Sequence, residues 1–85
     1  MKYSFSKHAL EQMDARSIPR EWVEKVMDKP DQVINQGDLI VFQSKVQSEA
    51  SEFLLRVYMN HLVEPALIVT VYKTSKISKY YENQI

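Results

Sequence analysis

Two long runs of alternating side chains near the end of the chain most constrain its fold. They cover residues 52–60 (EFLLRVYMN) and 66–73 (ALIVTVYK), and the five residues HLVEP separate them. Aromatic and β-branched residues with a two-residue period are typical of strands, and such a short connection favours an antiparallel hairpin. We therefore expect these two strands to supply the apolar surface that the rest of the chain must cover.

The two faces of these predicted strands differ in chemistry. One face is wholly apolar and consists of Phe53, Leu55, Val57 and Met59 in the first run and Leu67, Val69 and Val71 in the second. The opposite face holds Leu54, Arg56, Tyr58 and Asn60, together with Ile68, Thr70 and Tyr72. Both apolar faces need cover, so they should point the same way, which gathers Arg56, Tyr58 and Tyr72 on the outer face. That face suits phosphate and bases, or its tyrosines simply fill half-exposed strand positions, which they favour.

The first thirty residues carry a helical period instead. Ser6 is a good N-cap for a helix over residues 7–16, and Ser17–Pro19 breaks that helix. A second helix over residues 20–28 stops before Pro30, and its apolar face consists of Trp22, Val23, Val26 and Met27. We expect the two to form a helical hairpin over residues 6–28.

From residue 33 the period changes to two. We expect strands at residues 33–36 and 39–43 around a Gly37-Asp38 turn, a polar loop over 44–51, and a very short strand at Tyr3–Phe5. A basic and aromatic tail, residues 74–85, follows, in which Ser75 would cap a short helix. The predicted architecture is one α+β domain, residues 1–85. Its helical hairpin packs on one face of a four-stranded, mainly antiparallel sheet spanning residues 33–73.

Composition excludes several kinds of protein. One glycine is too few for a phosphate-cradling loop or a dinucleotide fingerprint, so no nucleotide cofactor is expected. The chain has no cysteine and only two histidines, so we expect neither disulfides nor a bound metal. No apolar run approaches the roughly 20 residues of a membrane span, and no signal core opens the chain. These features predict a cytoplasmic protein with no membrane partner.

Charge is balanced overall but uneven along the chain. Eleven basic and eleven acidic residues cancel, which argues against binding polyanions with the whole surface. From residue 65 onward, however, three lysines face one acid, Glu82, giving +2. An anion site should therefore lie in the C-terminal part or at Arg56.

Three pieces of the sequence resemble a family of small bacterial proteins of unassigned function. They read S-K-H-A-x3-M-x2-R at residues 6–16, LLRVY at 54–58 and V-Y-K-T-S-K at 71–76. This pattern is similar to a branch of the RelE/ParE-type toxin superfamily, which includes messenger-RNA endonucleases and gyrase inhibitors. The resemblance implies a ribonuclease-toxin type of domain, and the positions matching the family's polar pattern are His8, Arg16, Arg56, Tyr72, Lys76 and Tyr80. Ribosome-bound toxins are strongly basic, whereas this chain is neutral with a pI of about 6.7, which counts against ribosome engagement.

RNA cleavage without a metal needs a base, an acid and a cation at the phosphate. His8 has a suitable pKa for acid or base work, and Arg56 has the forked donors that hold phosphate. Tyr72 and Tyr80 complete the candidate catalytic set, since a phenol donates a proton or stacks on a base. The candidate substrate-binding residues are Arg16, Tyr58, Lys73, Lys76 and Lys79.

Each of these residues also has a structural explanation. His8 would only hydrogen-bond near its helix cap, and Arg16 would complement a helix C-terminus. Arg56 would form a surface ion pair worth little, and the lysines would be a solvated strand edge. The helices cover the face opposite Arg56, so His8 and Arg16 reach it only around the sheet edge. Otherwise the site splits in two.

Two functions follow from the sequence. The first is a toxin-like, metal-independent RNA endonuclease of a toxin–antitoxin system, with RNA and an antitoxin protein as partners. The alternative is a non-catalytic binding module, or a degenerate toxin fold, that acts through a protein partner or a homodimer. Its contact surface would be the apolar part of the outer face, namely Leu54, Tyr58 and Ile68.

Overall fold

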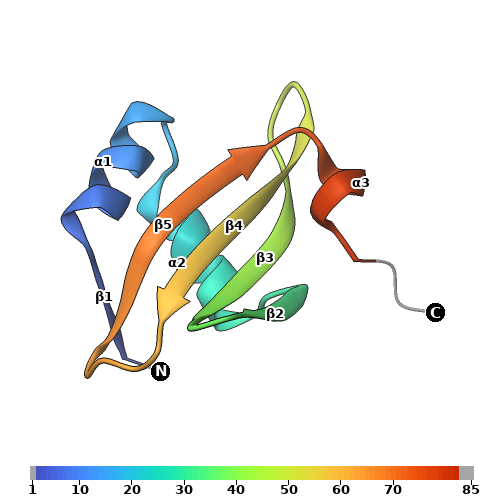
Figure 1. Cartoon of the computed structure of the whole chain (residues 1–85). Coiled ribbons are helices and arrows are strands. Elements are labelled where there is room, and N and C mark those ends of the chain that lie inside the picture. Colours follow the sequence, from blue (N-terminus) through green and yellow to red (C-terminus); the bar gives the residue numbers. More distant parts are fainter. Residues whose placement is uncertain (1, 83–85) are drawn as a thin grey trace.

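A five-stranded mixed sheet and three helices make up the computed structural model of the chain, which describes residues 2–82 (Figure 1). In chain order the elements are β1 (Tyr3–Phe5), α1 (Lys7–Ala15), α2 (Arg20–Asp28), β2 (Gln32–Gln36), β3 (Leu39–Gln47), β4 (Glu52–Asn60), β5 (Ala66–Thr74) and α3 (Ile77–Tyr80). The strand order is β1-β5-β4-β3-β2, with β1 parallel to β5 and the other neighbours antiparallel. The α+β class is confirmed. Met1 and residues 83–85 of the predicted domain and tail lie outside the described residues.

The prediction of a four-stranded sheet was wrong, because β1 is a fifth strand. The short strand expected at Tyr3–Phe5 is present, but its place in the sheet depends on a partner at the other end of the chain, where Tyr3 pairs with Ala66. The predicted helical hairpin also differs from the structure, since α1 makes its main contacts with β5 and α2 with β3 and β4. The sheet, rather than the other helix, is therefore the main packing partner of each helix.

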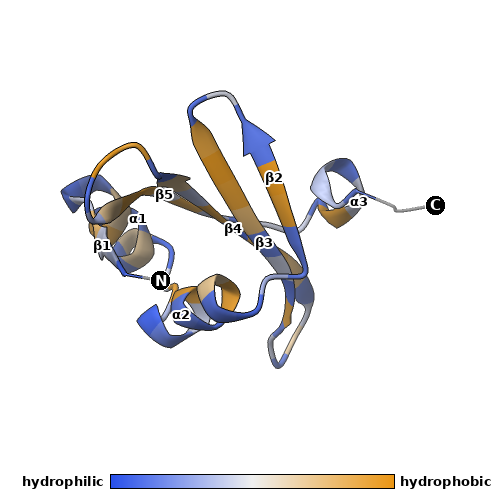
Figure 2. Cartoon of the chain, turned by 90° about the horizontal axis from the view of Figure 1, so that it is seen from below, coloured by the Kyte–Doolittle hydropathy of each residue, from blue (hydrophilic) through white to orange (hydrophobic). Residues whose placement is uncertain are grey.

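The sheet separates two unequal layers, which Figure 2 shows edge-on with α1 and α2 on one side and α3 on the other. The core lies on the side of the two longer helices and consists of Ala9, Met13, Ile18, Val23, Val26, Met27, Phe42, Leu55, Val57, Met59, Ile68 and Val71. We call this side the inner face and the side of α3 the outer face. No helix within residues 2–82 has the length and apolar character needed to cross a membrane.

The ends of α1 follow from local hydrogen bonding. Ser6 caps its start as predicted, because the Ser6 hydroxyl accepts a hydrogen bond from the Ala9 N–H at 3.0 Å. At its end Ser17 has a left-handed backbone with φ of 54°, and the Ile18 N–H donates to the Met13 carbonyl at 2.8 Å. This bond and the Ser17 N–H to Asp14 carbonyl bond form a Schellman cap, which turns the chain and buries Ile18 against the core.

Two details of the predicted strands were wrong. Residues 44–47, expected in a polar loop, continue β3, so the loop covers only residues 48–51. The alternation in β5 also shifts, because the pairing with β4 is irregular between Tyr58 and Met59. As a result Ile68 pairs with Met59 and is fully buried in the core, while Leu67 pairs with Asn60 and is half-exposed. A bulge adds one residue to a strand and reverses the faces beyond it.

Candidate functional site

A row of polar side chains crosses the middle of the outer face. The antiparallel registers place Gln32 opposite Gln43, Gln43 opposite Arg56, and Arg56 opposite Tyr72. Side chains of directly paired residues lie on the same face of a sheet about 5 Å apart. Four strands therefore bring these side chains together although they are far apart in the sequence.

Arg56 is the centre of this row. Its side chain is only 5% exposed, yet it lies on the outer face and not under α1 and α2. Its Nε donates to Gln43 Oε1 at 2.8 Å and its Nη1 to the Tyr58 hydroxyl at 2.8 Å. The Tyr80 ring covers the guanidinium from α3, with 4.6 Å between the guanidinium carbon and the ring centroid. We call this set of residues the Arg56 cluster: Arg56, Gln43, Tyr58, Tyr72 and Tyr80.

Gln43 positions the guanidinium and is itself fully buried. Its amide nitrogen donates to Gln32 Oε1 at 2.7 Å and to the Tyr80 carbonyl at 3.1 Å, which leaves its oxygen for Arg56. Gln32 also accepts from the Glu82 N–H at 3.0 Å. These hydrogen bonds therefore connect the segment around α3 to the sheet, and the bond to Gln43 holds the Arg56 guanidinium in place.

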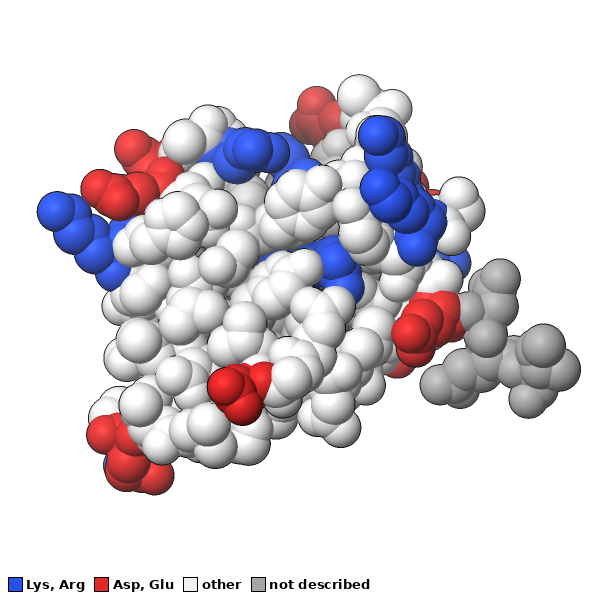
Figure 3. All heavy atoms as spheres, viewed as in Figure 1, with Lys and Arg blue, Asp and Glu red and all other residues white. Residues whose placement is uncertain are grey.

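The charge of Arg56 has no carboxylate partner among residues 2–82, where Arg20–Glu24 is the ion pair that the structure contains. A buried cation normally needs a counter-charge, because removing it from water costs several kcal/mol. Removing one partner of a buried ion pair destabilises a protein by about 3–5 kcal/mol for the same reason. Here neutral oxygens and two tyrosine rings stand in its place. Figure 3, which looks onto the outer face, shows basic atoms recessed among uncharged side chains near its middle.

Tyr72 is the member of the cluster that pairs with Arg56 from β5, and its pKa is lowered. The Thr74 hydroxyl, the Tyr80 hydroxyl and the nearby ammonium groups of Lys76 and Lys79 lower the pKa of Tyr72, with the Thr74 hydrogen bond as the largest cause. Its ring meets that of Tyr80 edge-on, with centroids 6.1 Å apart. These hydrogen bonds and ammonium groups favour the deprotonated form of the Tyr72 phenol.

The other candidate residues lie in a different part of the molecule. His8 and Arg16 are exposed and belong to α1 and its C-cap, in the inner layer. Lys73 also turns to that side, where its Nζ donates to the Arg16 carbonyl at 3.1 Å and lies 5.2 Å from the Phe53 ring centroid. The predicted residues thus split into two groups, and the group on the outer face consists of Arg56, Tyr58, Tyr72, Lys76, Lys79 and Tyr80.

Sequence reasoning missed the two glutamines. Gln43 ends the apolar run LIVFQ of β3, and a polar residue in a buried strand is a signal for a hydrogen-bonded network. Its partner, however, is set by the register of β3 on β4, which the sequence does not reveal. The predicted cap of the last helix was also wrong, because Lys76, not Ser75, is the N-cap of α3 and no side chain caps the helix.

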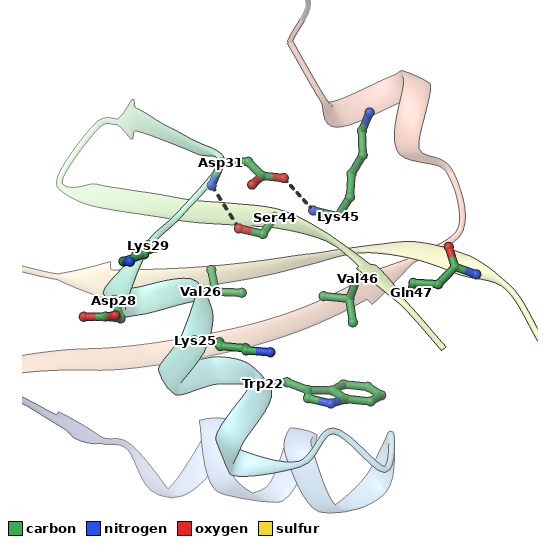
Figure 4. Close-up of a pocket in the computed structure, with 10 residues that line it drawn as sticks. All are labelled: Trp22, Lys25, Val26, Asp28, Lys29, Asp31, Ser44, Lys45, Val46 and Gln47. Atoms are coloured by element: carbon green, nitrogen blue, oxygen red, sulfur yellow. Dashed lines mark hydrogen bonds between the residues drawn. The ribbon is translucent and has the colours of Figure 1, made fainter. Parts of the chain in front are cut away.

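A hollow lies on the inner face of the sheet, between β3 and α2 (Figure 4). It has a volume of about 580 Å³ and is lined by Trp22, Lys25, Val26, Asp28, Lys29, Asp31, Ser44, Lys45, Val46 and Gln47. Figure 4 shows Trp22 and Val46 pointing into the space between the helix and the strand, while Lys45 points away from α2. This hollow could not be predicted, because residues 44–47 were expected in a loop and not in β3.

Comparison with known proteins identifies a family but no activity. The family described as a domain of unknown function, DUF4258, matches residues 5–73, and the chain belongs to it. Neither the search of curated proteins nor the search of solved structures found a match. Among residues 2–82 no three His, Asp or Glu side chains gather into a candidate metal site.

Proposed function

We propose that this member of the DUF4258 family is a toxin-like RNA endonuclease that works without a metal and uses the Arg56 cluster as its site. The observation that carries the proposal is the buried guanidinium of Arg56, which has no carboxylate partner in the described chain. A phosphate would supply the missing counter-charge. An Arg fork binds phosphate oxygens well because its donors are planar and fixed.

The residues around Arg56 supply the remaining groups that the cleavage of RNA requires. The Tyr72 phenolate takes the proton of the ribose 2′-hydroxyl, whose oxygen then attacks the adjacent phosphorus. The bond from phosphorus to the 5′-oxygen breaks, and that oxygen takes a proton from the Tyr80 phenol. Arg56 holds the charge that develops on the phosphate. Lys76 and Lys79 contact the RNA backbone as point charges.

Access to Arg56 requires the segment around α3 to move. This helix has four residues, none of them buried, and the bonds that hold its end to the sheet come from the side chains of Gln32 and Gln43. A short element with few buried contacts opens at low free-energy cost. The segment need shift only far enough for the phosphate to reach the guanidinium, so the Tyr80 hydroxyl stays at the site and a nucleobase would stack on the Tyr80 ring.

The test is cleavage of a labelled single-stranded RNA by purified protein in the presence of a metal chelator. We expect products that end in a 2′,3′-cyclic phosphate. Arg56→Lys should lower the rate about 100-fold, because it keeps the charge but loses the fork. Tyr72→Phe should also lower it about 100-fold, because the phenolate is lost.

Arg20→Lys is the matched control, because Arg20 is an exposed arginine on α2 and lies in the other layer. Its cleavage rate should equal that of the unchanged protein. Thermal unfolding of each variant separates a lost site from a lost fold. RNA that stays intact with the unchanged protein, or an Arg56→Lys variant that cleaves at full rate, would exclude the nuclease.

A second candidate function is that of a non-catalytic binding module. Half-exposed apolar side chains on the outer face, beyond the Arg56 cluster, favour this function. Of the apolar residues predicted for its contact surface, Leu54 and Ile68 are fully buried, so that patch was wrongly composed. The half-exposed apolar and aromatic residues that the registers place on this part of the outer face are instead Ile34, Leu39, Tyr58 and Leu67. Light scattering tests a homodimer through this patch, and a monomer at every concentration would exclude that dimer.

A further inference from the structure

A short segment at the end of the described chain covers the Arg56 cluster. After β5 the chain crosses the outer face and reaches the start of β2, so that α3 lies on the side of the sheet opposite α1 and α2 (Figure 2). We call residues 77–82, which end at Glu82, the strap. The Tyr80 ring of the strap lies 4.6 Å from the guanidinium carbon of Arg56. With the strap in this position Arg56 is only 5% exposed, so a ligand cannot reach it freely.

Gln32 holds the end of the strap. Its Oε1 accepts a hydrogen bond from the Glu82 N–H at 3.0 Å, and its Nε2 donates to the Glu82 carbonyl oxygen. One side-chain amide thus pairs with both backbone groups of a single residue. Gln32 is itself held, because its Oε1 also accepts from Gln43 Nε2 at 2.7 Å. Both glutamines are buried in the sheet, so the strap is attached to a fixed part of the fold.

Two cations of the sheet lie against two aromatic rings of the strap. The Arg56 guanidinium contacts the Tyr80 ring, and Lys45 Nζ lies 4.3 Å from the centroid of the Tyr81 ring. The two cations come from the neighbouring strands β4 and β3. A cation is attracted to the negative face of an aromatic ring. The strap therefore partly compensates the charge of Arg56 while it covers that side chain.

Little else keeps the strap in its closed position. Its helix α3 has four residues, none of them buried, and no side chain caps its start. A helix of this length is unstable on its own. The closed position therefore depends on the hydrogen bonds to Gln32 and Gln43 and on the two cation contacts. A segment held by so few contacts opens at a small cost in free energy.

We propose that the strap is an autoinhibitory element, which in its closed position keeps phosphate from Arg56 and whose opening is controlled by the pairing between Gln32 and Glu82. Its effect on RNA cleavage rests on the nuclease function proposed above, whereas the covering of Arg56 does not. RNA would bind only to the fraction of molecules with an open strap, and the apparent affinity falls by that fraction. Release of Glu82 leaves the bond from Gln43 to the Tyr80 carbonyl, so the Tyr80 hydroxyl stays near Arg56.

The test removes one hydrogen-bond donor from this pairing. Glu82→Pro has no backbone N–H to donate to Gln32, and Tyr81 already has the extended backbone that precedes a proline, with φ of −79° and ψ of 117°. The loss of one hydrogen bond should raise the open fraction about fivefold. The matched control is Glu82→Gln, which loses the same charge but keeps the N–H. Both variants should unfold at the same temperature as the unchanged protein, because Glu82 is exposed.

Access to Arg56 is measured with phenylglyoxal, a reagent that modifies accessible guanidinium groups, followed by peptide mass spectrometry. In Glu82→Pro the rate of Arg56 modification should rise about fivefold. The rate at Arg20, which is exposed, should stay the same and is the internal control. Hydrogen exchange of the Tyr81 N–H, which donates to the Ile77 carbonyl at 2.8 Å, should accelerate with it. Neither measurement needs RNA.

A second variant weakens the strap at another point. Lys45→Gln removes the cation beside the Tyr81 ring and should raise the rate of Arg56 modification about threefold. Its matched control is Lys25→Gln, a change at an exposed lysine of α2 in the other layer, which should leave that rate unchanged. This variant tests the strap without altering the end of the chain.

Cleavage of RNA separates this inference from the nuclease proposal. At RNA concentrations below KM, Glu82→Pro should cleave about fivefold faster than Glu82→Gln, and at saturation the two rates should be equal. Equal rates of Arg56 modification in these two variants would overturn the inference. Faster modification without faster cleavage, in a protein that does cleave RNA, would overturn it as well. If no variant cleaves RNA but Arg56 modification still accelerates, the covering of Arg56 by the strap is supported and only the nuclease is excluded.

Discussion

Strand β4 buries side chains on both of its faces, but by different means. On the inner face Leu55 and Val57 pack under the helices with no exposed surface, and their neighbours are apolar. On the outer face Arg56 is almost as well buried, yet its neighbours are Gln43, Tyr58 and Tyr80. On the inner face the apolar side chains need only fill the available volume. On the outer face each buried polar side chain needs its own hydrogen-bond partner. Apolar alternation alone therefore understates how much of a strand is buried.

The largest expected change in the free energy of unfolding tests which residue of β5 belongs to the inner face. Ile68→Ala should lower the free energy of unfolding by about 3 kcal/mol, because Ile68 is fully buried and leaves a cavity. Leu67→Ala should cost less than about 1 kcal/mol, since Leu67 is half-exposed on the outer face. Denaturant unfolding of both variants measures the difference. Equal costs would mean that the bulge in the β4–β5 pairing is absent.

A smaller change in the free energy of unfolding tests whether the outer face depends on its hydrogen-bond partners. Gln43→Leu should destabilise the fold by roughly 2 kcal/mol, because Arg56 Nε loses its acceptor while it stays buried. The double variant Gln43→Leu/Arg56→Leu should recover much of that loss, since the unpaired cation is then removed as well. A double-mutant cycle on denaturant unfolding measures the coupling. Strictly additive costs would show that the two side chains do not support each other.

The smallest effect concerns the phenol at the rim of the outer face. Tyr72 has a lowered pKa in the folded chain, so its phenolate forms at a lower pH there than in the unfolded chain. The corresponding stabilisation is present above the unfolded pKa and is lost as the pH falls through the folded pKa. Ultraviolet phenolate absorbance should show one early-titrating tyrosine that Tyr72→Phe removes. In Thr74→Val it should titrate later, because the largest cause of the lowered pKa is then removed, and an unshifted titration would contradict that cause.

The helices and the two long strands could be predicted from local chemistry. A Ser6 cap, the break at Ser17–Pro19 and the two-residue alternation of β4 are local signals, and each was found where expected, whereas the alternation of β5 shifts at the irregular pairing. The outer-face grouping of Arg56 with Tyr58 and Tyr72 also follows from alternation and is confirmed by the register. The bulge was missed because no residue type marks it in the sequence.

The candidate site was only partly predictable. Its charged and aromatic members carry recognisable chemistry, but Gln43 acquires a role only through the residue it faces. His8 and Arg16 lie in the other layer because Ser6 and Gln12 fix α1 to β5: the Ser6 hydroxyl donates to the Val69 carbonyl and the Val71 N–H donates to Gln12 Oε1. These contacts join residues about sixty positions apart, so no local pattern announces them.

The sequence by itself determined the kinds of element, their order and the polar side of β4, because capping, turn formation and alternation act between near neighbours. Only the tertiary structure decided that the Arg56 guanidinium is buried beneath α3, that β1 pairs with the outer edge of β5, and that within residues 2–82 no strand pairs with the last residues of β3 on the β2 side. Register and layer choice depend on the sum of many distant contacts, and each contact gains its free energy only when the others have formed.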